Sequence, residues 1–338
     1  MPAPDSLTIE PTETTAQPGS LRRRRIAVVL VTLSALTVFT VALFLTWGVD
    51  GHWDYALPRR LEQLLALAVV GVAVAISTVV FQTLTENRIL TPSIMGFDAL
   101  YVLLATSLVF VMGAPAVAAI PDLAMFAINT TLLVTTATLL YRWVLADGSR
   151  GLYTLVLVGV VAATLFGSVT SFMFRVMSPN EFDSLMSVLF ASFNAVDTTV
   201  LGIATVLLVA GVLAATREMA TLDVLTLGRA RAISLGVDYQ PAVTRLLVIV
   251  ACLVAVSTSL VGPITFLGLL AANLAYQLTR THRHVVTFAA AALVSVIALV
   301  LGQALLQHVL RFSATLGSII NLVGGVYFVV LLVRESKS

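Results

Sequence analysis

Charged side chains are scarce in this sequence. Only 11% of its 338 residues are Asp, Glu, Lys or Arg, whereas a soluble domain carries about one-quarter. Hydrophobic residues make up 59% of the chain, and the mean hydropathy is +1.02. This composition excludes an ordinary soluble domain and predicts a polytopic membrane protein. The net charge of only +2 gives no indication of a nucleic-acid partner.

Cysteine and catalytic motifs are nearly absent as well. Cys252 is the only cysteine, which excludes an internal disulfide and a Cys/His metal cluster. The sequence has no Gly-x-x-x-x-Gly-Lys-Ser/Thr loop, so the chain has no P-loop of its own. His282 and His284 stand two residues apart on a basic turn, where we expect both to be solvated. We therefore expect no metal, no cofactor and no enzymatic activity in this chain.

Long apolar runs dominate what is present. A membrane-spanning helix needs about 20 apolar residues, and backbone groups inside a membrane must find partners within the protein. Strand-like alternation is absent, so the runs are predicted to be helices of an all-α polytopic membrane protein. The region 262–306 could be divided in another way. We expect about ten transmembrane helices, at 26–47, 58–84, 94–112, 123–145, 152–174, 188–215, 242–260, 264–278, 285–306 and 316–333.

Polar tails flank this predicted membrane domain of residues 26–333. Residues 1–25 are largely rich in Pro, Thr and Ser, which predicts a disordered tail. Four arginines at 22–25 precede the first apolar run, as in a signal peptide. No Ala-x-Ala-like cleavage site follows that run, so we favour a retained first helix. Residues 334–338 form a short charged tail.

The positions of Lys and Arg predict the orientation, because cytoplasmic loops are enriched in them. Ten crossings place both termini on one side of the membrane, together with most of the cations. The opposite side carries only Arg59, Arg60, Arg175 and Arg311. This asymmetry predicts that both termini are cytoplasmic.

The loop 217–240 is the longest polar gap in the second half of the chain. Gly228 permits a turn into a short helix, and Gly236 can adopt the left-handed conformation that ends one. About two helical turns lie between them, too few to be stable alone. We therefore expect this helix to dock into a partner. In the alternative interpretation, Arg229 and Arg231 face lipid headgroups.

Four segments along the chain match the motifs of a known family. They are Pro58-Arg59-Arg60 with Phe81-Gln82-Thr83-Leu84 at the end of the same run, 87–96 (Asn-Arg-Ile-Leu-Thr-Pro-Ser-Ile-Met-Gly), Leu227-Gly228 to Leu235-Gly236 around Ala232, and 262–269 (Gly-Pro-Ile-Thr-Phe-Leu-Gly-Leu). From about 26 to 333 the chain resembles the iron-chelate (siderophore) and vitamin B12 type ABC importer permeases. Departures at 271–276 and at 324–326 resemble the branch that handles catecholate siderophores.

The resemblance implies a function and a set of partners. It implies a permease subunit that moves a ferric siderophore inward across the bacterial cytoplasmic membrane by alternating access. A separate cytoplasmic ATPase subunit would drive it, an extracytoplasmic solute-binding protein would deliver the substrate, and a second permease subunit would complete the path. The sequence does not specify which chelate is carried, or whether the two permeases are identical.

The resemblance also assigns roles to particular residues. The helix that contacts the ATPase would be formed by Leu227, Gly228, Arg229, Ala232, Leu235 and Gly236. The binding protein would dock on Arg59, Arg60 and Arg311, for which interfacial snorkelling is the alternative. The translocation path would be lined by Ser168, Ser171, Met173 and Asn321, for which plain packing is the alternative.

A secondary carrier or channel for a small polar solute belongs to a different functional class. Broken helices in a paired repeat and buried acids would favour it, and the sequence shows neither clearly. A membrane-bound enzyme is a third class, but no catalytic constellation is visible. We expect polar side chains within the runs, such as Gln82, Asn273, Gln277 and Gln307, to form hydrogen bonds between helices.

Overall fold

The structure is a computed structural model that describes residues 19–49, 51, 53–145, 152–189, 193, 196–310 and 315–335. All regular structure in these residues is helical. The elements are α1 (Gly19–Thr46), α2 (Trp53–Leu84), η1 (Pro92–Met95), α3 (Phe97–Met112), α4 (Ala114–Ala118), α5 (Asp122–Leu145), α6 (Leu152–Val176), α7 (Pro179–Leu189), α8 (Thr198–Arg217), α9 (Met219–Leu225), α10 (Arg229–Ser234), α11 (Tyr239–Val261), α12 (Leu267–Thr279), α13 (His284–His308) and α14 (Leu316–Glu335).

Each of the ten predicted apolar runs overlaps one of these helices. The sixth run, 188–215, differs most, because its first two residues belong to α7 and α8 begins only at Thr198. Seven helices are long and apolar enough to cross a membrane, namely α1, α2, α5, α6, α8, α11 and α13. The helices α3 and α14 contain shorter apolar segments, and α12 has 13 residues. The helical nature of the runs is confirmed, whereas the number of crossings stays a prediction.

The ends of the membrane domain differ from the predicted boundaries. The first helix begins at Gly19, so residues 19–25 are helical although we expected them in the disordered tail 1–25. Arginine and leucine are good helix formers, which allows α1 to extend through the four arginines. Likewise α14 continues to Glu335, past the expected end at 333. Residues 1–18 and 336–338 lie outside the described residues.

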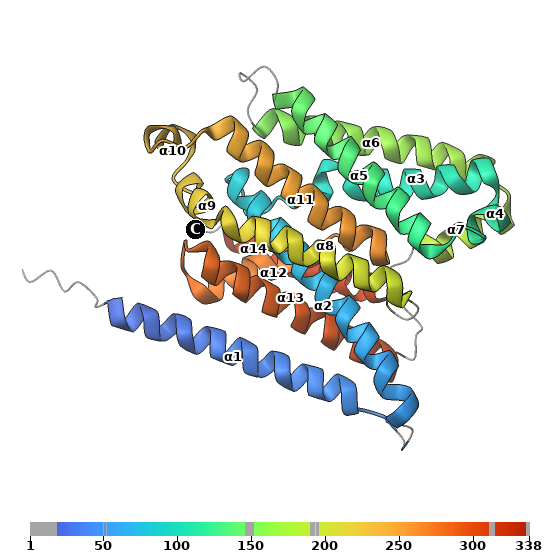
Figure 1. The fold of residues 1–338 in the computed structure, drawn as a ribbon, viewed down its shortest axis with the longest axis horizontal. Helices are drawn as coiled ribbons and strands as arrows, with labels where there is room; N and C mark the ends of the chain where they lie inside the picture. The colour runs from blue at the N-terminus through green and yellow to red at the C-terminus, as the bar shows by residue number, and fades with distance from the viewer. Residues whose placement is uncertain are drawn as a thin grey trace, which may run out of the picture.

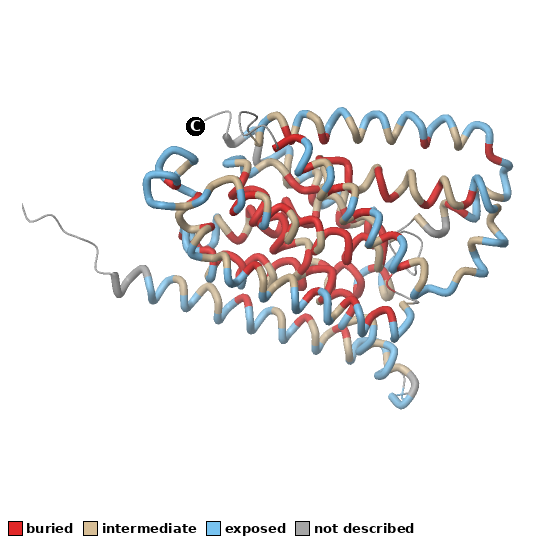
Figure 2. Tube along the Cα trace, turned by 45° about the horizontal axis from the view of Figure 1, so that its top comes forward, coloured by how far each residue is buried: buried red, intermediate tan, exposed pale blue. Residues whose placement is uncertain are grey.

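The centre of the molecule is formed by α2 and α11, which pack on each other along their lengths. On one side α2 packs against α13, and on the other α11 packs against α5 and α8. Figure 1 shows α3, α4, α5, α6 and α7 gathered on one side of the molecule. Figure 2 shows the buried residues concentrated in the middle, whereas α1 at the edge is mostly exposed.

The two ends of the bundle carry different short elements. Figure 1 shows α9 and α10 at the end where α1 begins, and α4 and α7 at the opposite end. At that opposite end, Trp47 stacks on His308 with ring centroids 4.8 Å apart, which joins the end of α1 to the end of α13. The α9–α10 end therefore contains the predicted ATPase-contacting loop.

The chain between α2 and α3 is irregular apart from the short η1: residues 86–88 are exposed, whereas Thr91, Pro92, Met95 and Gly96 are buried. The carbonyl of Arg88 accepts hydrogen bonds from Gln82 Nε2 at 2.7 Å and from Asn273 Nδ2 at 3.0 Å. Further along, Met95 packs so tightly against Gly159 of α6 that an added Cβ there would lie 2.9 Å from the Met95 Cα. Irregular backbone inside a membrane is tolerated where protein surrounds it, and the buried part of this segment, 91–96, has such surroundings on the side of α6.

Candidate functional site

The loop 217–240 forms two short helices joined by a turn. Gly228 begins α10 with φ +89°, and Gly236 ends it with φ +87°. The amide of Val237 donates to the Ala232 carbonyl at 3.1 Å, and that of Gly236 donates to the Ile233 carbonyl at 3.0 Å. This pair of bonds is the Schellman arrangement that closes a helix on a left-handed glycine. Both glycines therefore have the backbone role that the sequence predicts for them.

The α10 segment presents an apolar surface away from the bundle. Leu227, Ile233 and Leu235 are 47%, 51% and 63% exposed, respectively. Ala232 on the opposite side is fully buried, so a larger side chain there would displace α10. The guanidinium of Arg229 lies over the Tyr239 ring, 5.2 Å from its centroid, and Arg231 is exposed. One small face thus attaches α10 to the bundle, and the apolar side chains stay accessible.

A hydrogen-bond network around the buried His284 and the partly exposed Asp223 anchors α9 to α2 and α13. One carboxylate oxygen of Asp223 accepts from the backbone amide of His284 at 3.0 Å and lies 2.6 Å from its Nδ1. On the other side of the ring, His284 Nε2 lies 2.9 Å from the hydroxyl of Thr83. These contacts join α9 to the start of α13 and the end of α2. Displacement of α9 would therefore pull directly on two core helices.

The burial of His284 contradicts the expectation that both loop histidines are solvated. His284 is 3% exposed, because it begins α13 and turns its ring toward α2 and α9. His282 lies on the loop before α13. The sequence signal that could have identified one histidine as buried was Asp223, the single acid in the middle of the 217–240 loop. A buried imidazole needs a polar partner, and this carboxylate is one.

The three arginines predicted to dock a binding protein have different surroundings. Arg60 donates from Nη1 to the carbonyls of Phe44 and Leu45 at 2.8 and 3.0 Å, where α1 ends. It therefore satisfies carbonyls that the helix leaves without partners. Arg59 is exposed at the same level of α2. Arg311 lies outside the described residues.

The residues predicted to line a path lie on two helices that pack on different neighbours. Ser168 and Ser171 are exposed on α6, and each donates to a carbonyl of its own helix at 2.8 Å. Met173 is half-buried and receives a contact from the Ser107 hydroxyl at 3.9 Å. Asn321 is on α14, with a buried side-chain oxygen that has no partner in the described structure. Because α6 packs on α3 and α14 packs on α12 and α13, one chain does not bring them together.

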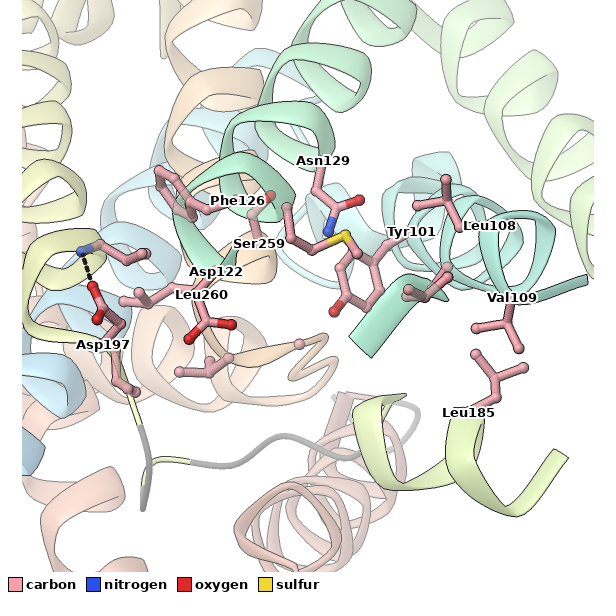
Figure 3. A pocket seen from close by; sticks show the side chains of 17 residues that line it. Tyr101, Leu108, Val109, Asp122, Phe126, Asn129, Leu185, Asp197, Ser259 and Leu260 are labelled. Carbon is pink, nitrogen blue, oxygen red and sulfur yellow. Dashed lines mark hydrogen bonds between the residues drawn. The ribbon is translucent and has the colours of Figure 1, made fainter. Parts of the chain in front are cut away.

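A cleft lies between α5 and α8, away from the α9–α10 end. It has a volume of about 230 Å³, and Figure 3 shows Tyr101, Asp122, Asn129 and Asp197 around it. Asp197 caps α8 by accepting from the amides of Thr199 and Val200 at 2.8 and 3.0 Å. These amide bonds hold the pKa of Asp197 below its usual range. Asp197 is thus the N-terminal cap of α8.

A comparison with protein families decides the class of the chain. The model of the FecCD transport family matches residues 25–334. The chain belongs to the FecCD transport family. This membership confirms the family inferred from the four sequence segments. Together with the seven long apolar helices, it makes the chain a multi-pass membrane transport protein.

Two members of the family are similar over almost their full length. The chain is 42% identical to the petrobactin import system permease protein YclO of Bacillus subtilis (strain 168), over 90% of this chain and 97% of that protein. It is 34% identical to the petrobactin import system permease protein FatC of Bacillus anthracis, over 92% and 90% of the two chains. Its fold resembles a metal-chelate type ABC transporter in an inward-facing conformation, with a TM-score of 0.80 over 91% of this chain and 99% of that one, at 20% identity.

Proposed function

We propose that the chain is the permease subunit of an ATP-binding cassette importer that carries a ferric siderophore inward across the bacterial cytoplasmic membrane. Membership of the FecCD family and the similarity to two petrobactin import permeases support this function. The single structural observation that supports it is the short helix α10. A glycine with positive φ lies at each end of α10, and the segment presents three exposed apolar side chains.

The ATPase subunit is the proposed partner of the α9–α10 end. Its contact surface would be the apolar side chains of Leu227, Ile233 and Leu235, with Arg231 beside them. Movement of α10 would reach the membrane helices through α9, because Asp223 is bonded to His284 at the start of α13. Burial of Ala232 holds α10 against the bundle, so that force on its outer face is transmitted rather than absorbed.

The membrane arrangement follows from the same proposal. The α9–α10 end would be cytoplasmic, the helices would cross ten times, and both termini would lie in the cytoplasm. A second permease, identical or different, would bring α6 and α14 of one chain toward those of the other. Ser168, Ser171, Met173 and Asn321 would then line a shared path. The exposed apolar face of α6, including Phe172 at 65% exposure, is the surface that such a partner or lipid would cover.

The proposed substrate is a ferric siderophore of the kind that contains catecholate groups, as the likeness to the two petrobactin permeases suggests. A solute-binding protein would deliver it to the end opposite α10, near Arg59, and Arg311 would be a further docking residue. Arg60 is the weakest of the three docking residues, because its guanidinium already binds the end of α1.

Uptake of labelled ferric siderophores by cells with and without this chain tests the function. We expect accumulation of ⁵⁵Fe-petrobactin to require the chain, the ATPase and external binding protein, and to stop when ATP is depleted. Ferric hydroxamates and ferric citrate serve as matched substrates. Uptake that continues without ATP but depends on an ion gradient would instead indicate the secondary carrier. Equal uptake in cells lacking the chain would refute both.

A further inference from the structure

A small polar cavity lies inside the membrane domain, where two irregular segments meet. It is enclosed by α2, α11, the segment 91–98 at the start of α3, and the segment 262–268 before α12. Its volume is about 20 Å³, enough for about one water-sized particle. Valine and isoleucine side chains form part of its wall, and seven Ser or Thr residues and one carboxylate, that of Asp98, also line it.

The carboxylate belongs to Asp98. Thr265 donates its hydroxyl to Asp98 Oδ2 at 3.1 Å, and the Ser93 hydroxyl also bonds to this carboxylate. Within the described residues, no Lys, Arg or His forms an ion pair with Asp98. The start of α3 offsets roughly half of a negative charge. The remaining charge is strongly unfavourable inside a membrane unless a cation or a proton neutralises it.

Two other hydroxyls of the lining already donate their protons within their own helices. Ser77 donates to the Val74 carbonyl at 3.1 Å, and Ser257 donates to the Val254 carbonyl at 2.9 Å. Each therefore keeps its oxygen lone pairs for another partner. Ser77, Thr78, Ser257 and Thr258 are between 1% and 4% exposed and all line the cavity. These oxygens can accept from a donor or ligate a cation, but they supply no positive charge.

We propose that this cavity binds one sodium ion between the Asp98 carboxylate and the hydroxyls of α2, α11 and Thr265. Oxygen ligands suit hard cations, and a single carboxylate balances a single positive charge. The space, about that of one water molecule, admits a single small ion. The ion would join the two irregular segments of the fold, 91–98 before and at the start of α3 and 262–268 between α11 and α12. This site is independent of the siderophore and of the ATPase.

Binding of ²²Na⁺ to the purified full-length protein in lipid nanodiscs tests the proposal. We expect about one sodium ion per chain, as the single carboxylate requires. The thermal midpoint should rise in NaCl but not in KCl or N-methylglucamine chloride at equal ionic strength, because a ligand of the folded state stabilises it. D98N should bind no ²²Na⁺, and without sodium its midpoint should equal or exceed that of the unsubstituted protein. D122N, which alters an exposed carboxylate, is the matched control and should bind normally.

A second variant keeps the test decisive if D98N does not fold. S257A retains the carboxylate and removes one wall oxygen, so we expect sodium binding to weaken by roughly tenfold while the fold is kept. Absence of ²²Na⁺ binding to the unsubstituted protein would overturn the proposal. So would a midpoint that follows pH but not sodium, since that result identifies a protonated Asp98, or a D98N variant that binds sodium as before.

Discussion

The two ends of the bundle both carry arginines and aromatic rings, but they use them differently. At the α9–α10 end, Arg231 and the apolar side chains of α10 are exposed, while Ala232, Asp223 and the Arg229 guanidinium over the Tyr239 ring make the internal contacts. At the opposite end, Arg60 turns inward to the last carbonyls of α1, and Trp47 stacks on His308. The difference teaches that an arginine near a helix end marks a docking surface only where the backbone does not already bind it.

The largest expected effect comes from placing a bulkier side chain at Ala232, the buried residue of α10. We expect Ala232→Leu to reduce siderophore uptake by at least roughly tenfold, because overpacking a buried site typically costs about 1–3 kcal/mol and would displace α10. Uptake of ⁵⁵Fe-siderophore and substrate-stimulated ATP hydrolysis measure the effect. Ala230→Leu, at an exposed position of the same helix, is the control. Equal uptake in both variants would mean that the position of α10 does not matter.

The second prediction concerns the anchor between α9 and α13. Asp223→Ala leaves the His284 amide and ring nitrogen without their partner, which should destabilise the fold by about 1–3 kcal/mol. We expect a lower thermal midpoint and a loss of uptake larger than the loss of protein from the membrane. Asp238→Ala is matched, because Asp238 precedes α11 but makes no capping bond through its side chain. If Asp238→Ala behaved like Asp223→Ala, the anchor would have no special role.

The third prediction separates two neighbouring arginines at the opposite end. Arg60→Ala should lower the thermal midpoint by an amount equivalent to about 1–3 kcal/mol, since two carbonyls of α1 lose a charged donor. Arg59→Glu should weaken docking of the binding protein by about 1 kcal/mol or less, in a salt-dependent way. Thermal unfolding and surface binding at two salt concentrations distinguish the variants. The assignment fails if Arg59→Glu docks normally at low salt.

The smallest expected effect concerns the glycine that ends α10. Gly236→Ala introduces a Cβ at φ +87°, which costs about 1–2 kcal/mol although the surrounding space is open. We expect a modest fall in the midpoint and in stimulated ATP hydrolysis. Gly202→Ala on α8 is the control, because that position is helical and also has open space around it. A fall of the same size in both variants would show that the left-handed conformation is unimportant.

Much of the fold could be predicted because the backbone hydrogen bonds of a membrane helix form within a single stretch of sequence. The backbone groups of an apolar run are hydrogen-bonded within its own helix, so most of the runs could be located from the sequence within a few residues. The start of α8 could not, because α7 ends and α8 begins within the single predicted run 188–215. The glycines at 228 and 236 were equally local signals, since a left-handed backbone favours glycine. The hydrogen bonds expected from polar side chains are present at Gln307, which donates to Gln63 at 3.0 Å, and at Gln277, which donates to Tyr327 at 2.9 Å.

Other parts depend on residues that meet only after folding. Asp223 and His284 are 61 positions apart, and Thr265 and Asp98 are 167 apart. No periodicity connects such positions, so the sequence suggested a solvated His284 and no buried acid with a partner. The direction of Arg60 was hidden for the same reason, because it depends on how α1 ends beside α2.

The sequence by itself determined the membrane class, the family and the position of the short helix between two glycines, because composition, helical runs and motifs are all local properties. The tertiary structure decided which faces of those helices are used. It placed Ala232 inward and Leu235 outward, bonded Asp223 to His284, and enclosed Asp98 among hydroxyls. The physical reason is that burial and hydrogen bonding belong to pairs of segments, and the pairing of segments is set only when the helices pack.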